Sequence, residues 1–133
     1  MTRRYFTPGE VDALIPELAR IMGKVMKAHE AVAALTGERE AERTRIVMVG
    51  GGLIDRHAWR RATARLARRT QEIEGGVRTI EDLGGTPKDL GLGLVDFPHW
   101  LNDREVNLCW RHGESEVRFW HGLDEGYGGR RPL

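Results

Sequence analysis

The chain has 133 residues, a length that fits a single domain over residues 1–133, and its 21 basic and 20 acidic residues leave a formal charge of +1. This balance selects no partner, and the absence of an apolar run near the roughly 20 residues that span a bilayer argues against a membrane partner. The single cysteine excludes an internal disulfide and the first residues show no secretory pattern, so we expect a cytoplasmic protein.

A long helix is predicted over residues 7–49. Thr7, Pro8 and Glu10 have the pattern of a capping box with a proline in the first turn, which satisfies free amides at a helix start. Apolar residues then recur in steps of three and four, the period of a coiled-coil seam: Val11, Leu14, Leu18, Ile21, Val25, Ala28, Val32 and Leu35. One side of this helix should therefore pack against a partner.

A second helix is predicted over residues 54–83, after a chain reversal at Gly50, Gly51 and Gly52. Its apolar seam is Trp59, Ala62, Leu66, Ile73, Ile80 and Leu83. Gly75 and Gly76 either kink this helix or let another helix approach closely. Two long helices joined by a short linker predict an antiparallel hairpin, and seam surface left over by the hairpin predicts a homo-oligomer.

Beyond Pro87 the apolar period changes from helical to two, which predicts a small sheet over residues 92–121. Two strands alternate around residues 105–111 and 116–120, and a third around residues 92–97 pairs with the first. With Gly113 and Glu114 as a two-residue turn, Leu108 would lie opposite Phe119. The fold class is therefore α+β: a long antiparallel helical hairpin followed by a small antiparallel β-sheet of about three strands, with a glycine-rich tail over residues 122–133.

Four segments of the chain have a familiar pattern. They are YFTPGEVDALIPEL, KDLGLGLVDFP, REVNLCWRHGESEVRFWH and GLDEGYGGRRPL. Together they resemble the domain of unknown function 2203 family of prokaryotic proteins, over nearly the whole chain. The resemblance implies these boundaries and this architecture, and it carries over no activity, cofactor or catalytic residue.

The polar face of the predicted sheet is the first candidate site. Its candidate ligand-binding residues are Asp96, Glu105, Arg111, Arg118, Trp120 and Arg130. In the simplest register Asp96 lies opposite Glu105, and two like charges at that distance call for a proton, an arginine or a metal between them. The tail would close over this face, or else be loosely held. The alternative to a site is a solvated face with ordinary ion pairs such as Arg111–Glu116.

His121 and Asp124 are candidate metal ligands in the same third of the chain, although their spacing matches no metal-binding signature. The predicted register places His121 on the apolar face, which favours a hydrogen-bonded histidine at the edge of the core. Cys109 reads as an inert strand residue, in preference to a nucleophile activated by Arg118. No cofactor is indicated.

A basic stripe on the second helix could contact phosphate groups. It consists of Arg56, Arg60, Arg61, Arg65, Arg68 and Arg69. Because Glu38, Glu40 and Glu42 are expected to face it across the hairpin, the pattern disfavours nucleic acid as a partner.

Two function hypotheses remain in front, and whether the protein is an enzyme stays open. The first is a non-enzymatic cytoplasmic binding or scaffolding module that self-associates through its helices, because the helical seams are the largest feature. The second is a small-ligand, anion or metal-binding protein, or an enzyme, with its site on the polar sheet face under the C-terminal tail.

Overall fold

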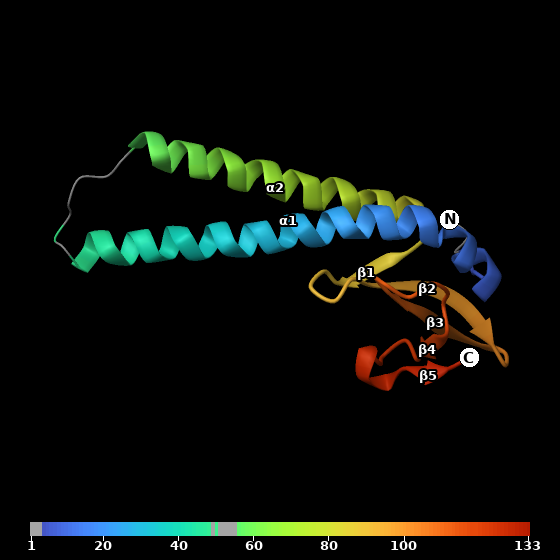
Figure 1. Cartoon of the computed structure of the whole chain (residues 1–133). Coiled ribbons are helices and arrows are strands. Elements are labelled where there is room, and N and C mark those ends of the chain that lie inside the picture. Colours follow the sequence, from blue (N-terminus) through green and yellow to red (C-terminus); the bar gives the residue numbers. More distant parts are fainter. Residues whose placement is uncertain (1–3, 49, 51–55) are drawn as a thin grey trace.

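The computed structural model describes residues 4–48, 50 and 56–133, and it has the predicted α+β architecture. Two antiparallel helices form a long rod, and an antiparallel sheet packs beside one end of it (Figure 1). The strands follow the chain in the order β1-β2-β3-β4-β5, so the sheet has five strands instead of about three. The elements are α1 (Pro8–Met48), α2 (Arg56–Asp82), β1 (Thr86–Asp89), β2 (Leu94–Leu101), β3 (Arg104–Arg111), β4 (Phe119–His121), the 3-10 helix η1 (Tyr127–Gly129) and β5 (Arg131–Pro132).

Both helices lie close to their predicted ranges, 7–49 and 54–83. Residue 49, residues 54 and 55, and two of the three glycines of the predicted reversal lie outside the described residues. The start of α1 is a capping box as predicted: Thr7 donates its amide to Glu10 Oε1 at 3.0 Å, and Glu10 donates its amide to Thr7 Oγ1 at 3.2 Å. Neither helix, within the described residues, has an apolar stretch long enough to cross a membrane.

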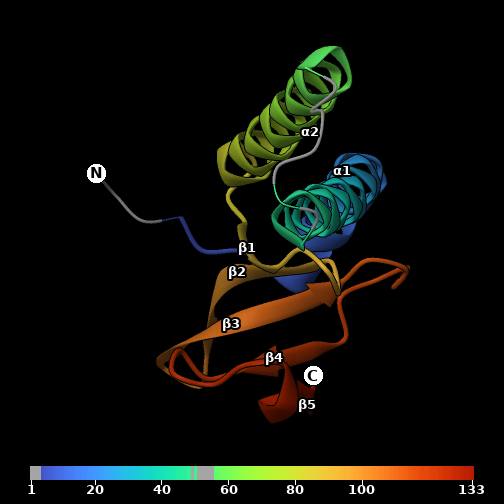
Figure 2. The ribbon, with the colours of Figure 1, turned by 90° about the vertical axis from the view of Figure 1, so that its left-hand side faces the viewer.

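The core lies around the first half of α1, which sits between α2 and the sheet in both views (Figures 1 and 2). This half of the helix therefore buries two sides, and its buried residues are Val11, Ile15, Leu18, Ile21, Met22, Val25 and Ala28. By contrast, α2 touches only α1 over most of its length, and Ile80 is its one buried residue among those described. The predicted seams are therefore buried only where the sheet also covers them.

The helices approach closely at Gly76, and α2 continues through both of its paired glycines. A Cβ atom on Gly76 would overlap a side-chain methyl group of Val25 on α1, whereas a Cβ atom on Gly75 would meet open space. Of the two expected roles for these glycines, the structure has the close approach at Gly76.

The hairpin of β2 and β3 turns at Asn102 and Asp103, whose φ angles of 51° and 62° suit a type I′ turn. Asparagine and aspartate tolerate this left-handed backbone better than other non-glycine residues, which explains why the turn forms here. The strand predicted to end near residue 97 consequently runs on to Leu101.

The predicted register between β3 and β4 is wrong by one residue. Leu108 lies opposite Trp120, not Phe119. Val117, which was expected in the strand, lies outside β4 and donates its amide to Asp12 Oδ1 on α1 at 2.7 Å. Because side chains alternate along a strand, the shift moves Trp120 to the helix-facing side and His121 to the opposite side.

The glycine-rich tail folds back along the sheet. In it, β5 pairs with β4, with Trp120 opposite Arg131, and Leu133 donates its amide to the Arg118 carbonyl at 2.8 Å. Of the two alternatives for the tail, the structure therefore has the folded-back one.

Candidate functional site

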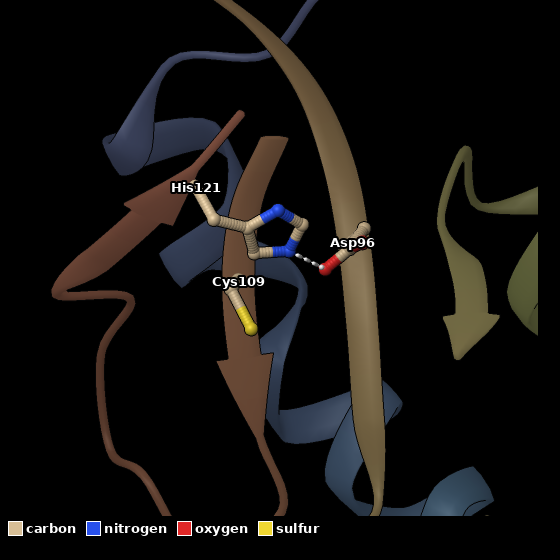
Figure 3. Close-up of side chains that lie close together, drawn as sticks. All are labelled: Asp96, Cys109 and His121. Atoms are coloured by element: carbon tan, nitrogen blue, oxygen red, sulfur yellow. Dashed lines mark hydrogen bonds and ion pairs between the residues drawn. The ribbon is translucent and has the colours of Figure 1, made fainter. Parts of the chain in front are cut away.

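Three different metal-ligand side chains meet on the sheet face that points away from the helices. Asp96 lies on β2 opposite Cys109 on β3, and His121 comes from β4. Figure 3 shows the imidazole ring of His121 extending toward Asp96, with Cys109 on the strand between them. All three side chains are buried, and one ligand atom from each lies within 4.8 Å of the others. We refer to these residues as the Asp–Cys–His cluster.

The hydrogen bonds of His121 define which of its nitrogens carries a proton. Nδ1 lies 2.8 Å from the carbonyl oxygen of Gly122, and a carbonyl oxygen only accepts, so Nδ1 carries a hydrogen. Nε2 lies 3.0 Å from Asp96 Oδ1. Without a cation at this position, that contact requires one proton shared by the imidazole and the carboxyl group.

The second carboxyl oxygen of Asp96, Oδ2, is buried and has no hydrogen-bond partner among the described residues. A buried acceptor without a partner loses its hydration without compensation, at a cost of about 1–3 kcal/mol. The cluster therefore contains one buried oxygen atom, Asp96 Oδ2, that lacks a hydrogen-bond donor among the described residues.

Cys109 is not an activated nucleophile in this environment. Burial, with a smaller effect of the negative charge of Asp96, raises the pKa of its thiol to about 12, although the positive charge of Arg130 acts in the opposite direction. The thiol is therefore protonated at neutral pH, as expected for an inert cysteine. Arg118, the residue considered as its activator, pairs instead with Glu116 at 2.9 Å, and Cys109 lies opposite Phe119.

The C-terminal tail covers this part of the sheet through Arg130. Its Nη2 lies 2.7 Å from Glu114 Oε2 and donates a longer hydrogen bond of 3.3 Å to the Cys109 carbonyl. The guanidinium group also lies 4.1 Å from the ring centre of Phe119 and 4.9 Å from that of Tyr127. Arg111 on β3 also holds the tail to the sheet, because it donates a hydrogen bond to the Tyr127 hydroxyl at 2.9 Å.

The predicted pair of like charges does not exist, because Asp96 lies opposite Cys109 and Glu105 lies opposite Trp100. Both carboxylates share a face of the sheet, as alternation requires, but they are far apart along β3. The prediction aligned the two strands as if the turn came before residue 101.

The other predicted site residues are distributed over both faces. Trp120 packs against the helix-facing core, so it lines no site with Asp96. Asp124 and Arg118 are exposed and lie apart from the cluster. Of the predicted ligand-binding and metal residues, the structure thus brings together Asp96 and His121, with Arg130 closing over Cys109 beside them.

Sequence reasoning missed the role of Glu114, which was assigned to a two-residue turn. Its carboxylate accepts from Arg130 and from the amide of Arg111 at 2.6 Å, and its carbonyl accepts from Trp110 Nε1 at 3.0 Å. The sequence signal here was Gly113, a residue type that suits a turn, and in the structure its φ is 105°. A turn signal does not predict which side chains and backbone groups Glu114 contacts.

A second candidate surface lies between the outer ends of the helices, where a groove of about 780 Å³ opens. We call residues 29–48 of α1 and 56–72 of α2 the distal arm. Arg39 on α1 spans the groove, with its guanidinium carbon 4.4 Å from the ring centre of Trp59 on α2. The groove is lined by Thr36, Arg39, Glu40, Arg43, Ile46, Val47, Arg56, Trp59, Arg60 and Leu66.

Within the described part of the chain, the glutamates of α1 in the distal arm do not pair with the arginines of α2 across the hairpin, contrary to the expectation from the sequence. Glu42 pairs with Arg45 of its own helix at 2.6 Å, and Arg69 pairs with Glu72 of its own helix at 3.1 Å. Among the described residues, no ion pair joins the glutamates at positions 38, 40 and 42 to an arginine of α2.

Comparison with known proteins found one family. Neither the curated proteins nor the solved structures gave a match to this chain. The model of a family described as uncharacterized conserved protein (DUF2203) matches residues 4–133, almost the entire chain, and its span includes both the helical hairpin and the sheet. By this match the chain belongs to the domain of unknown function 2203 family.

Proposed function

We propose that the protein is a non-enzymatic scaffolding module whose distal arm pairs with the distal arm of a second copy. The observation that carries this proposal is the apolar groove between the outer ends of the helices. A groove of this kind, left open in a monomer, is typical of a helical surface that a further helix fills.

The exposure of apolar side chains supports a partner at the arm. Val47 and Met48 are 73% and 79% exposed, and Trp59 is also exposed. The last buried residue of α1 is Ala28, so none of the described residues of the arm belongs to the core. Large apolar side chains gathered on one exposed surface mark an interaction site more often than inert surface.

A second copy of the chain is the occupant that best fits the charges. In the arm, the α1 segment carries four glutamates and three arginines, whereas the α2 segment carries six arginines between residues 56 and 69. A two-fold axis between two arms would set the nearly balanced α1 segment of each copy, and not a second basic segment, against the basic α2 segment of the other. Residues 29–48 extend about 30 Å at about 1.5 Å per residue, which is about the diameter of a small domain.

The cytoplasm is the location that we propose for this assembly. The single cysteine, Cys109, is a free buried thiol. Proteins with one unpaired cysteine are common in reducing compartments, where disulfides do not form. The scaffolding role and the location are independent, so the assembly can be tested with purified protein.

Light scattering coupled to gel filtration, over a wide range of concentrations, tests the pairing. The expected mass is twice the 15.1 kDa of one chain, decreasing toward one chain on dilution. Trp59→Glu should produce the monomer at every concentration, because it replaces the largest apolar side chain of the groove with a carboxylate. Leu123→Glu is the control, since Leu123 is exposed outside the arm and its replacement should leave the dimer intact.

A strictly monomeric parent protein would refute the proposal, as would a dimer that Trp59→Glu does not weaken. Titration with labelled DNA and RNA tests the alternative partner of the arm, a nucleic acid bound to the basic stripe. Tight, steeply salt-dependent binding that is lost on replacing Arg61, Arg65 and Arg68 would show that the stripe serves a nucleic acid instead.

A further inference from the structure

We propose that the Asp–Cys–His cluster is a structural binding site for a divalent transition-metal ion, with zinc as the best-fitting ion. The ligands would be Asp96, Cys109 Sγ and His121 Nε2. The ion would join β2, β3 and β4 under the C-terminal tail. The proposal does not depend on the pairing of the helical arms.

The donor atoms match the chemistry of zinc. One carboxylate oxygen, one sulfur and one imidazole nitrogen make a mixed set, and zinc binds all three types. Calcium and magnesium prefer oxygen ligands only, so the sulfur and nitrogen argue against them. The three side chains come from adjacent strands, which hold their backbones at fixed separations.

Asp96 provides the second, independent observation. Its side chain is only 3% exposed, and its Oδ2 atom has no hydrogen-bond partner among the described residues. Structures rarely keep a buried carboxylate oxygen unsatisfied, because the cost of its desolvation is then uncompensated. A cation bound between this carboxylate and its neighbours removes that cost.

His121 is already oriented as a metal ligand. The Gly122 carbonyl accepts the hydrogen of Nδ1, so Nε2 is the nitrogen directed toward Asp96, and it offers a lone pair once the shared proton has left. A backbone carbonyl that holds the far nitrogen in this way is the usual support of a zinc-bound histidine. A metal ion would displace two protons to solvent, the one shared by Nε2 and Asp96 Oδ1 and the one on the Cys109 thiol, because both ligands bind in their deprotonated forms.

The distances require only a small adjustment. The three ligand atoms lie within 4.8 Å of one another. Zinc bonds of about 2.0–2.3 Å place tetrahedral ligands roughly 3.5 Å apart. The proposal requires side-chain rotations that close this difference, and it uses both oxygens of Asp96 to complete the coordination.

Burial assigns the site a structural role. All three side chains are shielded from solvent, and Arg130 anchors the tail against the Cys109 backbone. Structural zinc sites are closed because the protein supplies all four donor atoms, here from three side chains with both oxygens of Asp96, whereas catalytic sites keep one position open for water or substrate. The expected consequence of metal binding is therefore stability of the sheet and the tail.

Metal titration of the chelator-treated protein tests the site directly. We expect one zinc ion per chain, a higher Tm with zinc, and an absorption band from sulfur-to-metal charge transfer when cobalt replaces zinc. Cys109→Ser should abolish that band, and Asp96→Asn should weaken zinc binding at least tenfold. Asp124→Asn is the matched control, because Asp124 is an exposed aspartate outside the cluster, and it should leave affinity unchanged.

Two results would overturn the proposal. One is a folded parent protein that binds no zinc at micromolar concentration and gives no charge-transfer band with cobalt. The other is stoichiometric binding that Cys109→Ser and Asp96→Asn leave intact, since the ion would then lie elsewhere. The cobalt spectrum of the parent protein decides the case even if a variant fails to fold.

Discussion

The amide of Val117 donates a 2.7 Å hydrogen bond to Oδ1 of Asp12, which ties the segment before β4 to the first turns of α1. Val117 is buried at this point and packs into the common core of helices and sheet. Because the bond is made with a helix and not with a strand, β4 begins only at Phe119. A side chain on α1 thus holds the segment that enters β4, while pairing with β3 and β5 defines which face each β4 residue occupies.

Removal of the Asp12 acceptor should destabilise the protein. Asp12→Ala leaves the Val117 amide without its partner in a partly buried position, so we expect the free energy of unfolding to decrease by about 1–3 kcal/mol. Asp12→Asn keeps a carbonyl oxygen at the same place and should cost less. Urea unfolding of the three proteins measures both values, and equal losses in the two variants would contradict the proposed role of the hydrogen bond.

The two neighbouring glycines of α2 should respond to alanine in opposite directions. Gly76→Ala places a methyl group against buried Val25, and overpacking of this kind costs about 1–3 kcal/mol. Gly75→Ala meets open space, so it should stabilise the helix by up to about 1 kcal/mol. Thermal unfolding compares the pair, and a stabilising Gly76→Ala would show that the helices are not in close contact there.

Features that depend on neighbouring residues were predictable from the sequence. The capping box at Thr7 and Glu10, the hairpin of helices and the alternation in β3 all follow from short-range patterns. The fold class follows from their order along the chain. The turn at Asn102 and Asp103 was not predicted, because the strand before it was expected to end near residue 97, although its residue types permit the required backbone.

Features that depend on distant contacts were not predictable. The bond between Asp12 and Val117 joins residues 105 positions apart, and no local pattern announces it. The predicted register, wrong by one residue, hid the cluster, because it placed His121 on the apolar face. The seam of α1 likewise gave no sign that burial would end at Ala28, since that limit is set by where the sheet packs.

The capping box should lose strength in acid. Hydrogen bonds from the Thr7 amide and hydroxyl, with a smaller effect of Arg4, hold the pKa of Glu10 below its usual value of 4.5. A carboxyl group whose pKa is lower in the folded state stabilises that state above pH 4.5 and loses the contribution as pH falls through its folded pKa. Stability measured across this range should therefore show Glu10→Gln below the parent at neutral pH and converging with it in acid. Glu74→Gln, an exposed change within α2, is the control, and a constant difference for Glu10→Gln at all pH values would refute the mechanism.

The ion pair between Arg130 and Glu114 should stabilise the folded protein far more than the exposed ion pair between Arg131 and Glu125. The side chain of Arg130 is 10% exposed where it meets Glu114, whereas that of Arg131 is 49% exposed where it meets Glu125. Arg130→Met leaves the Glu114 carboxylate partly buried without its main cation, so we expect a loss of about 3 kcal/mol. Arg131→Met removes a solvent-screened pair and should cost less than about 1 kcal/mol.

A double-mutant cycle with Glu114→Gln separates the pair from the packing of the Arg130 side chain. Coupling between the two positions should exceed about 0.5 kcal/mol, because the same two hydrogen bonds are lost in either single variant. Hydrogen exchange at the Leu133 amide, which bonds to the Arg118 carbonyl, reports whether the tail has separated from β4. Equal effects of Arg130→Met and Arg131→Met on both measurements would mean that the tail is held by the β4–β5 ladder alone.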